Sequence, residues 1–295
     1  MDKKLDIQFI GYGYMGSAIG NIVAKHTHDL KLCTTINIDD NKTLEEIDRR
    51  SWLLMSNYAT FQKTRESNAD LLFLCVKPQQ INDVFLDIYN RSTTCVSIMN
   101  GISTKKLSHF DTIIRTMPNL LWEVWSGITW WFVSGTIDED MKQFVQQLFT
   151  SSGIVIALQD EIQFSSFTAF AGCGPAIIAY IDEYCKDDIY RSYVYDRLKN
   201  VWCALGLWNE QAALIVEKLR EGVPKYLTKY GINSNELINR VSSKWGSTEC
   251  IIKSFQELGC EKMFAEQEKN IQALLFESIL AGKTKAEEIT IKYST

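Results

Sequence analysis

Short apolar runs alternate with longer amphipathic stretches from about residue 5 to residue 160. The short runs are rich in Val, Ile and Leu. The stretches between them repeat apolar residues at helical spacing, which is typical of βαβ units on a parallel sheet. The predicted strands cover residues 7–10, 30–36, 71–76, 95–99, 112–115, 129–133 and 154–157.

The pattern changes after about Glu161, where the β-branched runs disappear and long amphipathic segments follow one another. One of these segments places its apolar residues on a single helical face, formed by Ala212, Ile215, Val216, Leu219 and Val223. We therefore predict an α/β domain over residues 1–160 and an all-helical domain over residues 161–295. No linker rich in Pro, Gly or Ser separates the two.

Composition narrows the function classes. Hydrophobic residues make up 46% of the 295 positions, enough for folded cores, and the net charge is -5. Because Lys and Arg are scattered among acidic residues, we expect no nucleic-acid partner. The eight cysteines form no CxxC pair and no Cys/His cluster, so we predict no metal site. Without a signal-peptide pattern or a stretch near the roughly 20 apolar residues of a membrane span, we expect cytoplasmic residence and no membrane partner.

A glycine-rich turn follows the first predicted strand. Gly11, Gly13 and Gly16 form a GxGxxG pattern that opens an amphipathic helix. Gly11 permits the tight turn, Gly13 lets the backbone approach a pyrophosphate, and Gly16 allows close packing of helix and strand. A glycine-rich turn also occurs for structural reasons alone, but this position favours a dinucleotide-binding, Rossmann-like domain.

The end of the second predicted strand is where a dinucleotide's ribose is recognised. The segment there contains Asn37, Asp39 and Asp40. Asn37 or Asp39 could hold the ribose, and a simple polar turn explains the same residues equally well.

Three of the four prolines lie in short motifs. The motifs are VKPQ at 76–79, RTMPN at 115–119 and AGCGPA at 171–176, and SIMNGIS at 97–103 joins them. Together with GYGYMGSAI at 11–19, they resemble the patterns GxGxMGxAI, VKPQ, SIAAGI, RxMPN and SGSGPA of the pyrroline-5-carboxylate reductase family. Their order and spacing agree over nearly the full chain.

The resemblance implies a Rossmann-like N-terminal domain, an all-α C-terminal dimerisation domain and NADPH or NADH as cofactor. It implies hydride transfer to a small cyclic imino acid, 1-pyrroline-5-carboxylate, in proline biosynthesis by a homodimer or a larger homo-oligomer. The cofactor-binding residues it implies are Gly11, Gly13, Tyr14, Met15, Gly16, Asn37, Asn57, Val76, Lys77, Pro78, Asn100 and Gly101.

A further match lies at VSSKWGST, residues 241–248, where the family has VxSPGGTT. The resemblance places the substrate carboxylate on this loop. The Ser243 hydroxyl and the N–H groups of residues 246–248 would then form an anion site at a helix N-terminus. A plain helix cap, with Ser247 capping a helix that runs to Leu258, is the alternative. The implied substrate-binding residues are Val241, Ser243, Gly246, Ser247 and Thr248, with Thr248 the candidate catalytic hydroxyl.

Departures from the family pattern keep alternatives open. Lys244-Trp245 replaces Pro-Gly, Leu120-Leu121 replaces Thr-Pro, and the charged segment 186–199 is longer than in relatives. A reductase of another cyclic imino acid, or a cofactor-binding relative without turnover, remains compatible with these changes. The helical domain has no histidine, which disfavours chemistry of the lactate dehydrogenase type.

The cofactor preference is expected to differ from that of relatives. Family members commonly place an Arg after the second-strand Asn, where it can clasp a 2′-phosphate. This chain has Ile38, Asp39 and Asp40 there, so we expect NADH to be used comparably to NADPH or better.

Overall fold

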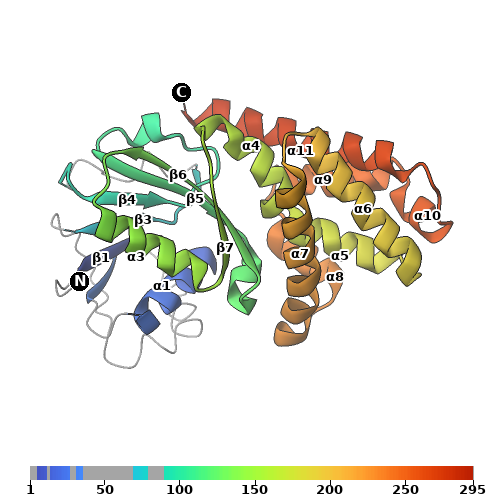
Figure 1. Cartoon of the computed structure of the whole chain (residues 1–295), viewed down its shortest axis with the longest axis horizontal. Coiled ribbons are helices and arrows are strands. Elements are labelled where there is room, and N and C mark those ends of the chain that lie inside the picture. The colour runs from blue at the N-terminus through green and yellow to red at the C-terminus, as the bar shows by residue number, and fades with distance from the viewer. Residues whose placement is uncertain (1–4, 12–13, 27–30, 36–68, 79–89, 295) are drawn as a thin grey trace.

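The computed structural model describes residues 5–11, 14–26, 31–35, 69–78 and 90–294 (Figure 1). A sheet forms one side of the molecule and a helical array forms the other. The elements, in chain order, are β1 (Asp6–Ile10), α1 (Tyr14–His26), β2 (Lys31–Thr35), β3 (Leu71–Leu74), β4 (Thr94–Ser97), η3 (Thr104–Leu107), β5 (Thr112–Pro118), η4 (Leu120–Val124), β6 (Gly127–Gly135), α3 (Glu139–Thr150), β7 (Gly153–Ala157), η5 (Glu161–Gln163), α4 (Phe164–Phe167), the π-helical turn η6 (Thr168–Gly172), α5 (Gly174–Tyr184), α6 (Asp188–Ala204), α7 (Asn209–Tyr230), α8 (Ser234–Val241), α9 (Ser247–Glu257), α10 (Cys260–Ala265) and α11 (Ile271–Ser294).

The seven strands form one sheet in the order β2-β1-β3-β4-β5-β6-β7. Each predicted strand is present, so the α/β fold with a helical second half is confirmed. The expectation of a parallel sheet is wrong at one place, because β6 pairs antiparallel with β5. The connection between these strands contains only η4, and a parallel crossover needs a dozen or more residues. The chain therefore turns back at this point.

Both faces of the central strands are covered. Ile7, Phe9 and Phe73 lie in a core with α1 and α3, and the rings of Phe9 and Phe73 stack with centroids 4.6 Å apart. Leu72, Leu74 and Cys95 belong to a separate core on the opposite face. Burial on both sides explains why these strands read as continuous apolar runs.

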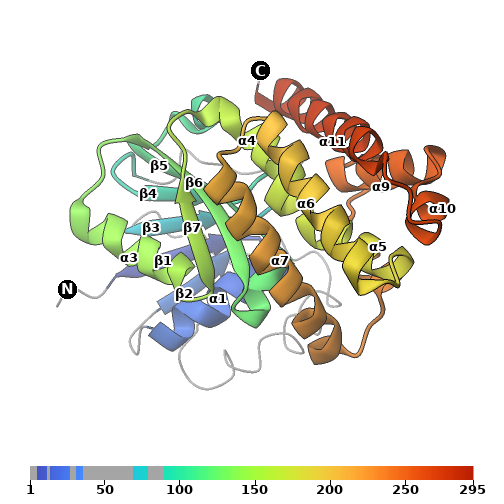
Figure 2. The ribbon, with the colours of Figure 1, turned by 45° about the vertical axis from the view of Figure 1, so that its right-hand side comes forward.

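The helical half has the largest core of the molecule. The predicted apolar face of α7 is confirmed, because Ala212, Ile215 and Leu219 are fully buried and Val216 and Val223 lie with them. Trp130 of β6 joins this core by stacking on Phe167, with ring centroids 3.9 Å apart. Figure 2 shows α7 passing beside the β6 end of the sheet, so the two halves share apolar contacts.

The segment Glu161–Tyr184 is helical except at Cys173 and is more apolar than the sequence analysis allowed. It is 24 residues long with a mean hydropathy of 1.4 over its most apolar window, so by length and composition it could cross a membrane. The expectation that no stretch approaches a membrane span is therefore wrong. In this fold 89% of that window is buried inside the protein, as in the core helix of a soluble protein.

Candidate active site

The carboxyl ends of β1, β3 and β4 meet at one edge of the sheet, where open α/β folds bind their ligands. Adjacent strand ends are joined by backbone hydrogen bonds. The Cys75 N–H donates to the Ile10 carbonyl at 2.7 Å, and the Ile98 N–H donates to the Leu74 carbonyl at 3.1 Å. The loops that follow these strands are therefore held side by side.

Gly11 makes the turn between β1 and α1 with a φ of 87°. A Cβ atom on Gly11 would lie 2.7 Å from the Cys75 carbonyl carbon, and one on Gly16 would lie 2.6 Å from the Gly11 carbonyl oxygen. Both positions thus require glycine, as the sequence analysis expected. The α1 helix begins at Tyr14, and its first turn carries no acidic residue, so no carboxylate there would oppose an anion at its positive end. This cradle fits a dinucleotide pyrophosphate.

The other cofactor-binding residues implied by the family resemblance fall in two groups. Met15, Val76 and Pro78 are half-buried and Lys77 is exposed, all close to the edge where β1 and β3 end. Gly13, Asn37 and Asn57 lie outside the described residues, as do Asp39 and Asp40.

The loop after β4 contains Asn100 and the buried Gly101, which has a φ of 77°. A Cβ atom at Gly101 would lie 2.7 Å from Cγ2 of Ile289 on α11. Figure 1 shows α11 crossing from the helical half until its C-terminal end reaches the sheet half. The last helix therefore packs against the loop that carries two of the cofactor residues implied by the family resemblance.

The N-terminus of α9 differs from the sequence expectation. Gly246, with φ -89° and ψ 172°, is the N-cap, and as a glycine it offers the helix no side-chain cap. The alternative interpretation, in which Ser247 caps α9, is wrong, because Ser247 is already the first helical residue. Its hydroxyl is buried and has no hydrogen-bond partner among the residues that the structure describes. An unused buried hydroxyl in the first turn fits a ligand site better than a cap does.

The Gly246 N–H does not belong to the anion site as predicted. It donates to the Ser243 carbonyl at 2.9 Å and closes the turn before the helix. The N–H groups of Ser247 and Thr248 remain for a ligand, because first-turn N–H groups have no partner inside their own helix. Ser243 is exposed and Val241 half-buried at the entry to this turn.

The Thr248 hydroxyl is buried and donates to Sγ of Cys173 at 3.2 Å. Cys173 stands where the family pattern has Ser, directly before α5. Burial raises the pKa of the Cys173 thiol to about 12, so it stays protonated at neutral pH. Because sulfur is a weak acceptor, the hydroxyl can exchange this contact for a better one.

Lys244 and Trp245 form an exposed corner before α9. Trp245 has the left-handed φ of 64°, and its N–H donates to the Glu249 carboxylate in the first turn of the helix. The ring is 73% exposed, with the Lys244 ammonium 5.8 Å from its centroid. A bulky residue in this backbone conformation is strained, and such strain concentrates at functional sites.

Asn119 links two of the motifs. Its amide Nδ2 donates to the Ala171 carbonyl at 3.0 Å, while its Oδ1 accepts from the Ile128 N–H at 3.2 Å. The carboxyl end of β5 is therefore tied to the turn that leads to Cys173.

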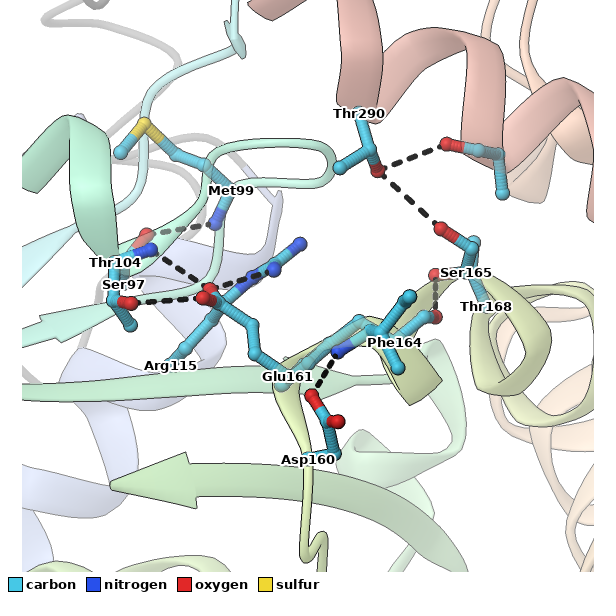
Figure 3. A network of polar contacts seen from close by, with 12 residues as sticks. Ser97, Met99, Thr104, Arg115, Asp160, Glu161, Phe164, Ser165, Thr168 and Thr290 are labelled. Carbon is cyan, nitrogen blue, oxygen red and sulfur yellow. Dashed lines mark hydrogen bonds and ion pairs between the residues drawn. The ribbon is translucent and has the colours of Figure 1, made fainter. Parts of the chain in front are cut away.

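Figure 3 shows a second link that sequence reasoning did not assign. The Glu161 carboxylate accepts hydrogen bonds from the Arg115 guanidinium at 2.8 Å, from the Thr104 N–H at 2.7 Å and from the Thr104 hydroxyl at 2.8 Å. The only sequence signal was that Arg115 opens the RTMPN motif within a buried strand.

Two family models match the chain. Residues 6–101 match the model described as NADP oxidoreductase coenzyme F420-dependent, and residues 161–273 match the model described as pyrroline-5-carboxylate reductase dimerisation. With the glycine cradle at the sheet edge, these matches define the chain as an oxidoreductase that uses a nicotinamide dinucleotide.

Curated relatives agree over most of the length. The chain is 26% identical to the pyrroline-5-carboxylate reductase of Aquifex aeolicus over 86% of this chain and 89% of that protein. It is 25% identical to that of Staphylococcus haemolyticus over 89% of this chain and 93% of that protein. Over most of its length the chain is similar to the pyrroline-5-carboxylate reductase family.

Solved structures share the fold. A pyrroline-5-carboxylate reductase from Coxiella burnetii superposes with a TM-score of 0.55 at 23% identity, covering 98% of this chain and 99% of that chain. The Plasmodium falciparum pyrroline carboxylate reductase with NADP bound gives a TM-score of 0.53 at 20% identity, covering 97% of this chain and 98% of that chain.

Proposed function

We propose that this chain reduces 1-pyrroline-5-carboxylate to proline. In this reaction the imine, NAD(P)H and a proton give the cyclic amine and NAD(P)⁺, so that the C=N bond gains a hydride on carbon and a proton on nitrogen. The observation that carries the proposal is the combination in one chain of a dinucleotide cradle at Gly11 and Gly16 with the α9 N-terminus, where Ser247 leaves a buried hydroxyl unused.

The cofactor would lie along the sheet edge, with its pyrophosphate at Gly11, Gly16 and the α1 N-terminus and its nicotinamide end beside the Val76 and Gly101 loops. When bound, it supplies the hydride. These residues contribute orientation, which accounts for much of the barrier reduction when a protonated imine accepts a hydride.

The substrate carboxylate would bind the first-turn N–H groups and the Ser247 hydroxyl of α9. Thr248 would then turn its hydroxyl from Cys173 toward the imine nitrogen. A hydroxyl is sufficient as a donor here, since an imine needs less acid assistance than a carbonyl does. Exclusion of water follows from the burial of Thr248, which is 6% exposed.

The protein would act in the cytoplasm, in amino-acid biosynthesis, as a homodimer. The match of residues 161–273 to a dimerisation model supports self-association. We assign residues 1–160 to the dinucleotide-binding domain and residues 161–295 to substrate binding and dimerisation. The helical segment that begins at Glu161 directly after β7 supports this division.

A second candidate is reduction of a larger cyclic imino acid. The exposed Trp245 in its strained conformation favours it, because an aromatic ring beside the carboxylate site offers apolar surface to a longer substrate.

Steady-state assays with purified protein test both functions. The expected result is oxidation of NAD(P)H that depends on pyrroline-5-carboxylate and forms proline. A six-membered cyclic imino acid serves as the comparison substrate, and a higher kcat/KM for it would favour the second candidate. Cofactor binding without turnover of either imine would contradict both.

The same assay tests the cofactor preference at fixed ionic strength, since a phosphate contribution is salt-sensitive. We expect NADH to be used comparably to NADPH or better. A tenfold preference for NADPH, about 1.4 kcal/mol, would contradict this expectation.

A further inference from the structure

Glu161 is the first residue of the helical half, yet its carboxylate accepts three hydrogen bonds from residues of the sheet half (Figure 3). One carboxylate oxygen accepts from both the Thr104 N–H and the Arg115 guanidinium, and the other accepts from the Thr104 hydroxyl. Both oxygens are thus used, and the side chain is fixed at two points.

Arg115, the charged partner of Glu161, is also fixed in position. It is 2% exposed within β5, and its guanidinium lies 4.2 Å from the centroid of the Phe164 ring. A buried guanidinium of this kind requires a charge partner, and Glu161 provides it at 2.8 Å. The ion pair therefore fixes where the Glu161 carboxylate lies.

Thr104 is the residue at which the β4 loop ends and η3 begins. Its N–H is the kind of helix-end donor that a cap normally satisfies, but the N-cap Ser103 makes no side-chain hydrogen bond to this turn. Glu161 satisfies it instead, from 57 residues away in the sequence. The loop is also fixed at its start, where the Met99 N–H donates to the Ser97 hydroxyl at 3.3 Å.

Between these fixed ends lie Asn100 and Gly101. The middle of the loop abuts Ile289, which would be 2.7 Å from a Cβ atom at Gly101. The loop follows the end of β4, next to the end of β3. A dinucleotide bound at this sheet edge with its pyrophosphate at α1 would bring its nicotinamide end toward this loop.

We propose that Glu161, oriented by Arg115, is a positioning residue that holds the β4 loop against the nicotinamide end of the cofactor. This assignment rests on the proposed function, because it takes the sheet edge as the dinucleotide site. Glu161 does not touch the reacting atoms and acts through Thr104.

Measuring the Kd of two ligands distinguishes a positioning role of Glu161 from a general effect on the stability of the protein. The first is the reduced dinucleotide that the protein binds more tightly, and the second is its fragment without nicotinamide, ADP-ribose or the 2′-phosphate of ADP-ribose. Glu161→Gln should raise the Kd of the dinucleotide about tenfold, equivalent to ~1.4 kcal/mol. The Kd of the fragment should change less than twofold. Equal weakening of both ligands, or no change in either, would overturn the assignment.

Thr104 supplies a milder pair of variants in case Glu161→Gln fails to fold. Thr104→Val removes only the hydroxyl contact and should raise the dinucleotide Kd about threefold. Thr104→Ser keeps that contact and should bind like the wild type. Identical binding by the Val and Ser variants would overturn the role of this contact.

The matched control is Asp111→Asn. Asp111 pairs with Arg91 at 3.0 Å on the surface. The pair lies at the amino ends of the parallel strands β4 and β5, away from the proposed cofactor site at the carboxyl ends. Its removal should leave both Kd values unchanged, and a selective loss of dinucleotide binding in this variant would overturn the assignment. If the wild type binds dinucleotide but reduces no imine, the proposed function fails while the ratio of the two Kd values still decides the role of Glu161.

Discussion

The N-termini of α1 and α9 are both preceded by a glycine and are both proposed to bind anions, but they differ in charge. The first turn of α1 has no acidic residue, whereas that of α9 contains Glu249. The positive end of a helix amounts to about half an elementary charge, and a carboxylate in the first turn offsets part of it. The same structural device thus suits a doubly charged pyrophosphate at α1 and a singly charged carboxylate at α9.

The two ends also differ in what makes them specific. At α1 the backbone segments lie so close together that a Cβ atom at Gly11 or Gly16 would clash with them. The absence of side chains at these two positions is therefore what shapes this end. At α9 the buried hydroxyls of Ser247 and Thr248 provide directed polar groups. We therefore expect added side-chain volume to weaken binding at the α1 N-terminus, and loss of a polar group to weaken function at the α9 N-terminus.

The largest effect is expected for Gly11→Ala. The new Cβ would need a backbone position at φ 87° and would lie 2.7 Å from the Cys75 carbonyl carbon. We expect a loss of about 3 kcal/mol or more in the free energy of unfolding, measured by urea denaturation, with no measurable dinucleotide binding.

Gly231→Ala is the control for Gly11→Ala. Gly231 ends α7 at φ 60° with no atom within 4 Å of an added Cβ, so only backbone strain changes. A loss of about 1 kcal/mol and normal cofactor binding are expected. If both variants bound cofactor equally well, the steric account of the α1 end would be wrong.

A smaller effect, on turnover alone, is expected for Thr248→Ala. Removal of the proton-donating hydroxyl should lower kcat about 100-fold, or ~2.7 kcal/mol, with the dinucleotide Kd unchanged. Thr248→Ser retains the hydroxyl and should keep most of the activity. A full loss in the Ser variant, or an unchanged kcat in the Ala variant, would remove this hydroxyl from the mechanism.

The smallest effect tests the charge comparison itself. Glu249→Gln keeps an acceptor for the Trp245 N–H but removes the negative charge from the first turn of α9. We expect the KM for the imino acid to fall two- to fivefold at low salt and the difference to shrink at high salt. A KM that rises would show that the carboxylate organises the Trp245 corner more than it opposes the substrate.

Strand positions could be predicted because buried parallel strands appear as continuous apolar runs. The direction of β6 could not, since the side chains of a strand alternate in the same way whichever way the strand runs. The length of the connection containing η4 held that information, because it is too short for a crossover.

The site was predictable where the residues are local in sequence. Gly11 and Gly16 act within one turn and one helix, so their spacing alone is informative. The partners Arg115 and Glu161 lie 46 residues apart, and only the folded chain brings them together. The alternative in which Ser247 caps α9 placed the cap one residue too late, because Gly246 adopts the extended N-cap conformation and leaves Ser247 inside the helix.

The buried helical segment Glu161–Tyr184 has a consequence for synthesis of the protein. Many of the residues that cover it, on α6, α7, α9 and α11, leave the ribosome after it does. Until they arrive, the nascent chain presents a long apolar helix without its covering surface. Its solubility during translation therefore depends on how quickly the C-terminal third of the chain follows.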